Sequence, residues 1–178
     1  MDVINAVLFD WRGTLVVDWA DEWWIEQALS GTNRTPGHGE IASLLDSLAA
    51  ARAIPRVAAM LRDADVSADQ HRSSNLAWFD AAGLDAGLAT ALYELDFDRR
   101  CHPFARDVAA VLGPLRERGV RTAVVSDIHF DLRPEFEAAG MVDLVDSFML
   151  SFEHGVCKPN PAIFRIALDL LGSSPMRP

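Results

Sequence analysis

Short, almost wholly apolar runs along the chain predict the strands of a sheet. Three such runs carry hydrophobic residues at consecutive rather than alternating positions: Val3–Phe9, Arg121–Val125 and Ser147–Ser151. Strands of a parallel sheet are covered on both faces, and this continuous pattern is typical of them. The three runs are therefore predicted to be strands of one parallel sheet.

Segments with helical spacing follow or separate these runs. Hydrophobic residues recur three or four positions apart over Val108–Leu115, and Gly119 stands where that helix would end. Two more helices are predicted over Pro134–Ala139 and Pro161–Leu171, each followed by a glycine. The alternation of strands and helices predicts right-handed β-α-β units, and thus an α/β fold with a doubly wound parallel sheet.

The stretch between the first two strands has a different pattern. It lacks strand-like runs, whereas Ile41–Ala49 and Leu88–Leu95 have hydrophobic residues at helical spacing. Pro55 is typical of the first turn of another helix, and Ser67–Gln70 has the sequence of a capping box. We therefore expect an all-helical module inserted into the α/β domain. The predicted boundaries are residues 1–15 and 103–178 for the α/β core and residues 16–102 for the helical module.

Composition narrows the classes of function. The 178 residues carry 16 Lys+Arg against 26 Asp+Glu, which gives a formal net charge of −10. A field of this sign repels phosphate backbones and anionic lipid, so we expect neither nucleic acid nor a membrane as partner. The chain has no apolar run near the length of a membrane span and no basic signal-peptide region at its start. We expect a cytoplasmic protein, in which a small anionic substrate would meet a few local cations.

Polar side chains follow each predicted strand. Asp10 comes directly after the first strand, Ser126 and Asp127 end the second, and Lys158 lies just beyond the third. Ligands bind at the carboxyl ends of the strands in open α/β sheets, so these groups are expected at one edge. A carboxylate nucleophile, a hydroxyl and an ammonium group at one point suit phosphoryl transfer, usually with a divalent cation.

The residues around these groups resemble three motifs of the haloacid dehalogenase-like (HAD) hydrolase superfamily. Asp10–Leu15 reads D-W-R-G-T-L where the family has D-x-D-G-T-L, and Val124–Asp127 supplies a serine at a strand end. Gly155–Phe164, with the sequence G-V-C-K-P-N-P-A-I-F, is similar to the family's lysine motif. The resemblance implies a HAD-like, Rossmann-like core and identifies the helical insert with the cap that follows the first motif in this superfamily.

The resemblance also implies roles for three residues. Asp10 would be the nucleophile and a ligand of Mg²⁺, Ser126 would bind the phosphoryl group, and Lys158 would stabilise its charge. The function implied first is that of a Mg²⁺-dependent phosphatase, which hydrolyses a small phosphomonoester through an aspartyl-phosphate.

The turn after Asp10 supplies further expected contacts with the substrate. Gly13 and Thr14 let backbone amides approach anionic oxygens, and Arg12 and Asp127 complete the predicted substrate-binding set. Arg12 is also a departure, because the family's phosphatases have an acid/base aspartate there and a guanidinium stays protonated. Its role is open between a salt bridge that disables Asp10 and a cation that holds the substrate.

The family's fourth motif has no counterpart in this sequence. Its strand should follow the helix that precedes Gly172 and lie beside the first strand. We therefore expect that C-terminal strands are missing, that the sequence is a truncated form of a longer protein, and that its first strand has an exposed edge. Catalysis by this chain is an open question.

Two alternatives accompany the phosphatase. A 2-haloacid dehalogenase also lacks aspartate at the position of Arg12 and needs no metal. A non-catalytic remnant would bind phosphate weakly or have no enzymatic role. For Trp19, Trp23 and Trp24, helical spacing favours the core of the helical module over a position facing the substrate. His129 is expected to be a solvated residue at a helix start rather than to line the entrance of the site.

Overall fold

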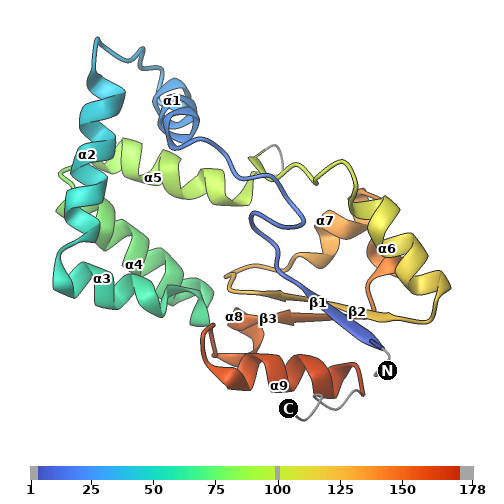
Figure 1. The fold of residues 1–178 in the computed structure, drawn as a ribbon. Coiled ribbons are helices and arrows are strands. Elements are labelled where there is room, and N and C mark those ends of the chain that lie inside the picture. Colours follow the sequence, from blue (N-terminus) through green and yellow to red (C-terminus); the bar gives the residue numbers. More distant parts are fainter. Residues whose placement is uncertain (1–3, 99–100, 173–178) are drawn as a thin grey trace. The chain divides into compact units, whose positions relative to one another are not determined.

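The three predicted strands form one parallel sheet in the computed structural model, which describes residues 4–98 and 101–172. They are β1 (Ala6–Phe9), β2 (Arg121–Ser126) and β3 (Ser147–Leu150), and β2 lies between the other two (Figure 1). Of the first strand predicted over Val3–Phe9, Val3 lies outside the described residues, and Ile4 and Asn5 precede the strand that the structure shows. Phe9 pairs with Val124 and Ser126 pairs with Leu150, so the carboxyl ends of all three strands meet at one edge.

Consecutive residues of the sheet face two separate hydrophobic clusters. Val124 and Phe148 belong to one cluster, whereas their neighbours Val125 and Met149 belong to another. Helices cover both faces, with α6 and α7 on one side and α9 on the other (Figure 1). This arrangement confirms the α/β fold with a doubly wound parallel sheet. The covering helices are α6 (Val108–Glu117), α7 (Arg133–Ala138) and α9 (Pro161–Leu170).

Local signals set the ends of these helices where the sequence predicts them. Gly119 and Gly140 follow α6 and α7 with φ of 71° and 66°, a left-handed conformation that glycine adopts without strain. Pro161 begins α9, and the Asn160 side chain accepts a hydrogen bond from Ala162 N at 3.0 Å. The predicted third strand is one residue too long, because Ser151 begins a helix. Two short elements complete this part: η4 (Val142–Leu144) and α8 (Ser151–His154).

The described part of the predicted helical module contains helices joined by loops and turns, and none of the three strands. Phe79 and Leu92 are fully buried in its core, and the Trp24 ring stacks on Trp78 with centroids 6.3 Å apart. Trp24 packs against this core, which is the position that its helical spacing favours. The helices are α1 (Asp21–Gly31), α2 (Glu40–Arg52), α3 (Pro55–Arg62), η1 (Ala64–Val66), α4 (Ala68–Ala81), α5 (Ala86–Glu94) and η2 (Leu95–Phe97).

The chain separates into two compact units. The sheet unit comprises the chain up to Val17, the segment Asp65–Ala68 and the chain from Pro103 onward. The helical unit comprises Asp18–Ala64 and Asp69–His102. Four residues from the middle of the helical stretch, 65–68, are thus part of the sheet unit. None of the described helices has both the length and the apolar character that a membrane span requires.

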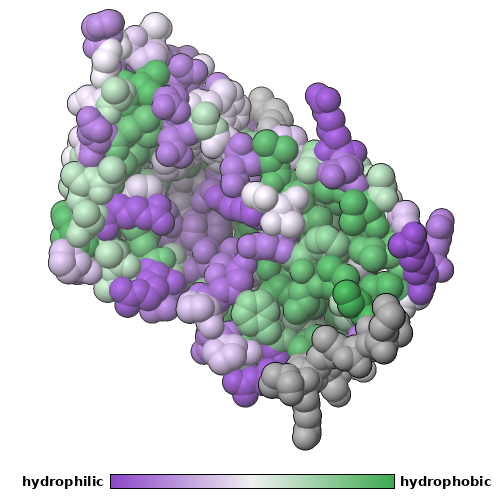
Figure 2. Space-filling model, viewed as in Figure 1, coloured by the Kyte–Doolittle hydropathy of each residue, from purple (hydrophilic) through white to green (hydrophobic). Residues whose placement is uncertain are grey.

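The edge of the sheet at β1 carries partly exposed hydrophobic residues. In the described part of the chain β1 pairs with β2 alone, and all four of its residues are half-buried. Ile4, just before β1, is 65% exposed. Figure 2 shows hydrophobic surface over this part of the sheet unit.

Candidate active site

Asp10 follows β1 directly, and its carboxylate forms an ion pair with Lys158. Lys158 Nζ lies 2.7 Å from Asp10 Oδ1, and Trp11 N–H donates to the same oxygen at 2.8 Å. The Asp10 and Lys158 side chains are 48% and 25% exposed, so a small molecule has access to the pair. The structure thus brings together two residues that the sequence predicts to be catalytic.

Lys158 is attached to the end of β2 by both its backbone and its side chain. Its N–H donates to Asp127 Oδ1 at 2.9 Å, and Nζ donates to Val125 O at 3.4 Å. Because Asp127 and Val125 both lie at the carboxyl end of β2, these two contacts leave the ammonium group little freedom to move away from the sheet edge. The Lys158 side chain is therefore oriented by β2 before any substrate binds.

Asp127 is a half-buried carboxylate among charged groups. Burial raises its pKa above the ordinary value of 3.8, and the negative charges of Asp65 and Asp10 raise it further. The hydrogen bond from Lys158 N–H and the positive charge of Lys158 act in the opposite direction but do not cancel the effect of burial. A negative charge at this position is thus disfavoured by its surroundings.

Ser126 lies at the expected sheet edge but is not joined to the ion pair. It is the last residue of β2 and is only 2% exposed. Its hydroxyl makes one long contact, 3.5 Å, with the carbonyl oxygen of Asp127. In the described part of the chain no hydrogen bond connects Ser126 with Asp10 or Lys158, so the structure places the serine close to the strand ends without engaging it.

The turn after Asp10 has one buried anchor and an exposed tip. The Trp11 side chain is fully buried, and its ring packs against Phe104 and Phe136 with centroids 5.3 and 5.6 Å away. Leu15 N–H donates to Trp11 O at 2.9 Å, which closes the turn. Arg12, Gly13 and Thr14 form its exposed tip, and Gly13 has a φ of 68° that favours glycine. Trp11 therefore fixes the turn and leaves the predicted substrate-binding residues facing solvent.

One signal in the sequence marks Lys158 more strongly than its motif does. Among 16 basic residues it is the sole lysine; the others are arginines. Arginine supplies the same charge on a larger, planar group, whereas lysine offers a compact ammonium on a flexible stem. The compact ammonium group of this chain therefore stands at the sheet edge, beside Asp10. Counting residue types would have identified this position.

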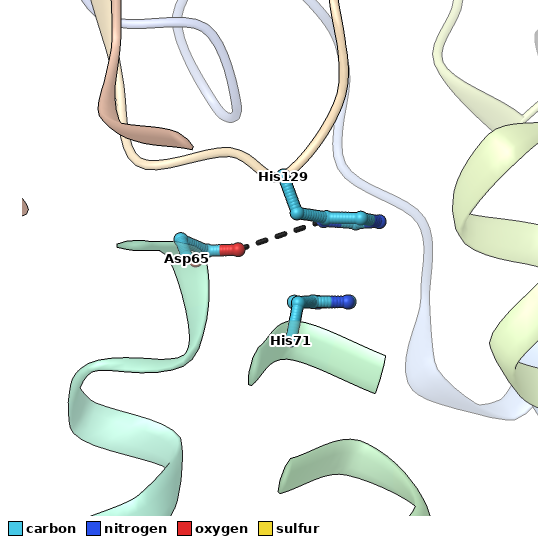
Figure 3. Close-up of side chains that lie close together, drawn as sticks. All are labelled: Asp65, His71 and His129. Atoms are coloured by element: carbon cyan, nitrogen blue, oxygen red, sulfur yellow. Dashed lines mark ion pairs between the residues drawn. The ribbon is translucent and has the colours of Figure 1, made fainter. Parts of the chain in front are cut away.

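The expectation that His129 is solvated is wrong. The residue is 3% exposed, and its Nδ1 lies 3.5 Å from Asp65 Oδ1 (Figure 3). Asp65 is in turn held in the sheet unit, because Ser151 Oγ donates to its carbonyl oxygen at 2.6 Å. Local sequence around His129 does not indicate this burial, since Asp65 is distant in the chain.

Solved structures with a similar fold come from dehalogenases and phosphatases. A dehalogenase structure aligns with a TM-score of 0.63 at 18% identity, over 99% of this chain and 75% of that chain. An L-2-haloacid dehalogenase from Xanthobacter autotrophicus aligns with a TM-score of 0.61 at 23% identity, over 98% of this chain and 67% of that chain. At these identities the likeness shows the fold.

Sequence comparison gives a curated relative and the family. A phosphoserine phosphatase from Thermus thermophilus is 33% identical over 79 residues, which is 44% of this chain. The chain matches about a third, 32%, of that protein's length. A model of the haloacid dehalogenase-like hydrolase family matches residues 4–177. With this match over nearly its whole length, and with its sequence motifs at the ends of a HAD-like sheet, the chain belongs to the haloacid dehalogenase-like hydrolases.

Proposed function

We propose that this protein is a phosphatase of small phosphomonoesters, with Asp10 as its nucleophile. The observation that carries the proposal is the Asp10–Lys158 ion pair of 2.7 Å at the strand-end edge of the sheet. An Asp10 oxygen would attack phosphorus as the bond to the leaving alcohol breaks, which gives an aspartyl-phosphate. Water would then cleave the acyl-phosphate, releasing phosphate and restoring the carboxylate. The likeness to a phosphoserine phosphatase supports this choice of chemistry.

The other site residues would bind and neutralise the phosphoryl group. The Lys158 ammonium already lies against the attacking carboxylate, so it would also contact oxygens that carry the charge of the transition state. The exposed turn would offer the Gly13 backbone amide to the same oxygens, and Thr14 N–H would join it on giving up its hydrogen bond of 3.3 Å to Trp11 O. Ser126 would add a hydroxyl once its side chain turns from the Asp127 carbonyl.

Asp10 has the chemistry of a Mg²⁺ ligand. Mg²⁺ is commonly held by one or two carboxylates together with phosphate oxygens and water, and Asp10 offers a half-exposed carboxylate at the sheet edge. The residues therefore fit a cation that the substrate helps to bind. When bound, Mg²⁺ would shield the carboxylate from the negative charge of the phosphate.

The helical unit is proposed to act as the cap that selects the substrate. We assign residues 1–15 and 103–178 to the catalytic core and residues 16–102 to the cap, of which Val16, Val17 and Asp65–Ala68 belong to the sheet unit. Because the net charge is −10, a small anionic substrate would have to be held by a few local cations, and we propose the cytoplasm as the location of the protein.

Arg12 favours a second candidate, a 2-haloacid dehalogenase. It is exposed on the turn directly after Asp10, where a guanidinium would bind the carboxylate of a haloacid. Because arginine does not act as acid or base, a phosphatase with Arg12 would lack a group worth about 10²–10⁴ in rate. Arg12→Asp should therefore raise phosphate release by a factor in this range if the phosphatase proposal is right.

Product release from defined substrates tests these proposals. We expect phosphate release from p-nitrophenyl phosphate in the presence of Mg²⁺, its loss with a chelator, and a drop of at least about a thousandfold in Asp10→Asn. Halide release from 2-chloropropionate without metal, equally lost in Asp10→Asn, would replace the phosphatase by the dehalogenase. A chain that shows neither reaction, before and after Arg12→Asp, would contradict both and leave the non-catalytic alternative.

A further inference from the structure

The position of the Lys158 ammonium depends on the turn that carries it. Lys158 lies between α8 and α9, in a turn closed by a hydrogen bond of 3.0 Å from Asn160 N–H to Cys157 O. That bond fixes the turn internally but does not attach it to the sheet. Two other contacts reach the sheet: Nζ donates to Val125 O at 3.4 Å, and Val156 packs against the cluster that contains Val125. Neither holds the backbone of Lys158, from which the side chain starts.

Asp127 joins that backbone to the sheet through its side chain. Oδ1 of Asp127, the residue immediately after β2, accepts the Lys158 backbone N–H at 2.9 Å. The contact joins the strand end to the residue whose ammonium meets Asp10, so a shift of the acceptor would move the base of the lysine side chain. Burial excludes much of the water that would otherwise satisfy this N–H.

The contact needs an acceptor oxygen at this place rather than a negative charge. Burial raises the pKa of Asp127, and the nearby Asp10 carboxylate repels a second charge. An asparagine side chain has the same shape and presents a carbonyl oxygen, so it would accept the same N–H without that cost.

We propose that Asp127 is a positioning residue, whose side-chain oxygen holds the Lys158 turn on the end of β2 and so places Nζ against Asp10. This assigns the carboxyl group a task distinct from direct contact with the substrate, which the sequence predicted. The consequence for catalysis rests on the proposed function, whereas the placement of Lys158 does not.

The single lysine allows a direct test that needs no enzymatic activity. The folded protein is treated with trace acetic anhydride, and acetylation of Lys158 is measured by peptide mass spectrometry relative to the α-amino group in the same sample. An amine held against a carboxylate reacts slowly, so loss of the ion pair raises the relative rate. Loss of an ion pair that contributes about 1 kcal/mol corresponds to an increase in the acetylation rate of about fivefold.

Two variants separate the position of the acceptor from its charge. Asp127→Asn keeps the oxygen in place and removes the charge, and its relative rate should equal that of the wild type. Asp127→Glu keeps the charge but displaces the oxygen by one methylene, and its rate should rise about threefold to fivefold. Asp10→Asn removes the partner of Lys158 and sets the upper limit.

A matched control comes from the same strand. Asp146 Oδ2 accepts Thr122 N–H at 2.7 Å, a contact of the same kind at the other end of β2. Asp146→Asn and Asp146→Glu should leave Lys158 acetylation unchanged, even where they lower the unfolding temperature. Variants are compared only after circular dichroism and a cooperative thermal transition show that they are folded.

Two results would overturn the proposal. Equal rates in wild type and folded Asp127→Glu would show that the contact does not place Lys158. A raised rate in Asp127→Asn would show that the charge, rather than the acceptor, matters. Absence of phosphatase activity in every variant contradicts the proposed function alone, because acetylation still reports the position of Lys158.

Discussion

Two ion pairs with the same shortest distance serve different purposes in the two units. In the helical unit Arg34 Nη1 lies 2.7 Å from Asp85 Oδ2, and in the sheet unit Lys158 Nζ lies 2.7 Å from Asp10 Oδ1. Arg34 also binds Glu40, with Nη2 2.9 Å from Oε1. Distance alone does not distinguish the pairs, so their difference must lie in what else each carboxylate contacts.

The acidic partners of Arg34 are occupied by backbone groups. Asp85 accepts Leu88 N–H at the start of α5, and Glu40 accepts Gly37 N–H. These backbone hydrogen bonds are the main reason that the pKa of each carboxyl is lowered, and Arg34 adds to the effect. The helical pair therefore fixes loops and helix starts.

At the sheet edge, too, one cation contacts two acidic residues, but one of them, Asp127, is half-buried. Asp10 and Asp127 repel each other, burial raises the pKa of Asp127, and Lys158 bonds to both. Ionisable groups whose pKa is shifted by burial and by neighbouring charges are common at ligand-binding and catalytic sites. Asp10 also accepts a backbone N–H, from Trp11, so backbone contacts do not distinguish the two pairs. What distinguishes them is the surroundings of the carboxyl groups, which lower the pKa at Asp85 and Glu40 and raise it at Asp127.

The largest effect should come from the core of the helical unit. Phe79→Ala removes a ring that is 1% exposed and lies 5.1 Å from Trp78, and it should cost about 3–5 kcal/mol of stability by urea unfolding. Phe97, 48% exposed with its ring 5.5 Å from Tyr93, offers a control that should cost about 1 kcal/mol on truncation. If Lys158 were acetylated faster in folded Phe79→Ala than in the wild type, the core of the helical unit would affect the sheet-edge ion pair, and the two units would not be separable in this way.

Replacing the cation of each ion pair, Lys158 or Arg34, should separate an effect on catalysis from an effect on stability. Lys158→Met should lower phosphate release by about 10²–10³-fold, because one group that stabilises developing charge is lost. Lys158→Arg should restore only part of the rate, since the planar guanidinium does not reproduce the position of Nζ. Arg34→Met should leave kcat unchanged, and a comparable loss in that variant would contradict the assignment of its ion pair.

Removal of a helix cap should have a moderate effect confined to stability. Asp85→Ala deletes the side chain that accepts Leu88 N–H at 3.0 Å and should cost about 1 kcal/mol in urea unfolding. Asp85→Asn keeps an acceptor and should cost less. Equal losses in the two variants would show that the charge, and not the cap, carries the contribution.

The smallest expected effect concerns the pH dependence of stability, to which the carboxyl groups of Asp85 and Asp127 should contribute in opposite directions. Asp85 has a lowered pKa, so its contribution is present above the ordinary value of 3.8 and is lost as the pH falls through the lowered pKa. Asp127 has a raised pKa, so the folded state keeps its proton longer and stability decreases as the pH rises from 3.8 through the raised value. Asp127→Asn should therefore gain stability relative to wild type over that rise. Parallel urea midpoints for the two proteins across this window would contradict the assigned direction.

Local signals in the sequence determined the elements and the edge at which polar groups lie. Continuous hydrophobicity predicted the three strands, and residues such as Gly119 and Pro161 marked helix ends, because capping and periodicity depend on near neighbours. Asp10 and Lys158 follow strands of one parallel sheet, so the topology alone brings them to a common edge.

The tertiary structure decided which atoms meet at that edge. It buries Trp11 under the turn, encloses His129 beside Asp65, and pairs Asp127 with the backbone of Lys158 while Ser126 remains apart. Such contacts join residues that are far apart in the chain, and their geometry follows from the packing of whole helices and strands. The pattern of neighbouring residues predicts where a strand ends. It does not predict which partner each side chain contacts there.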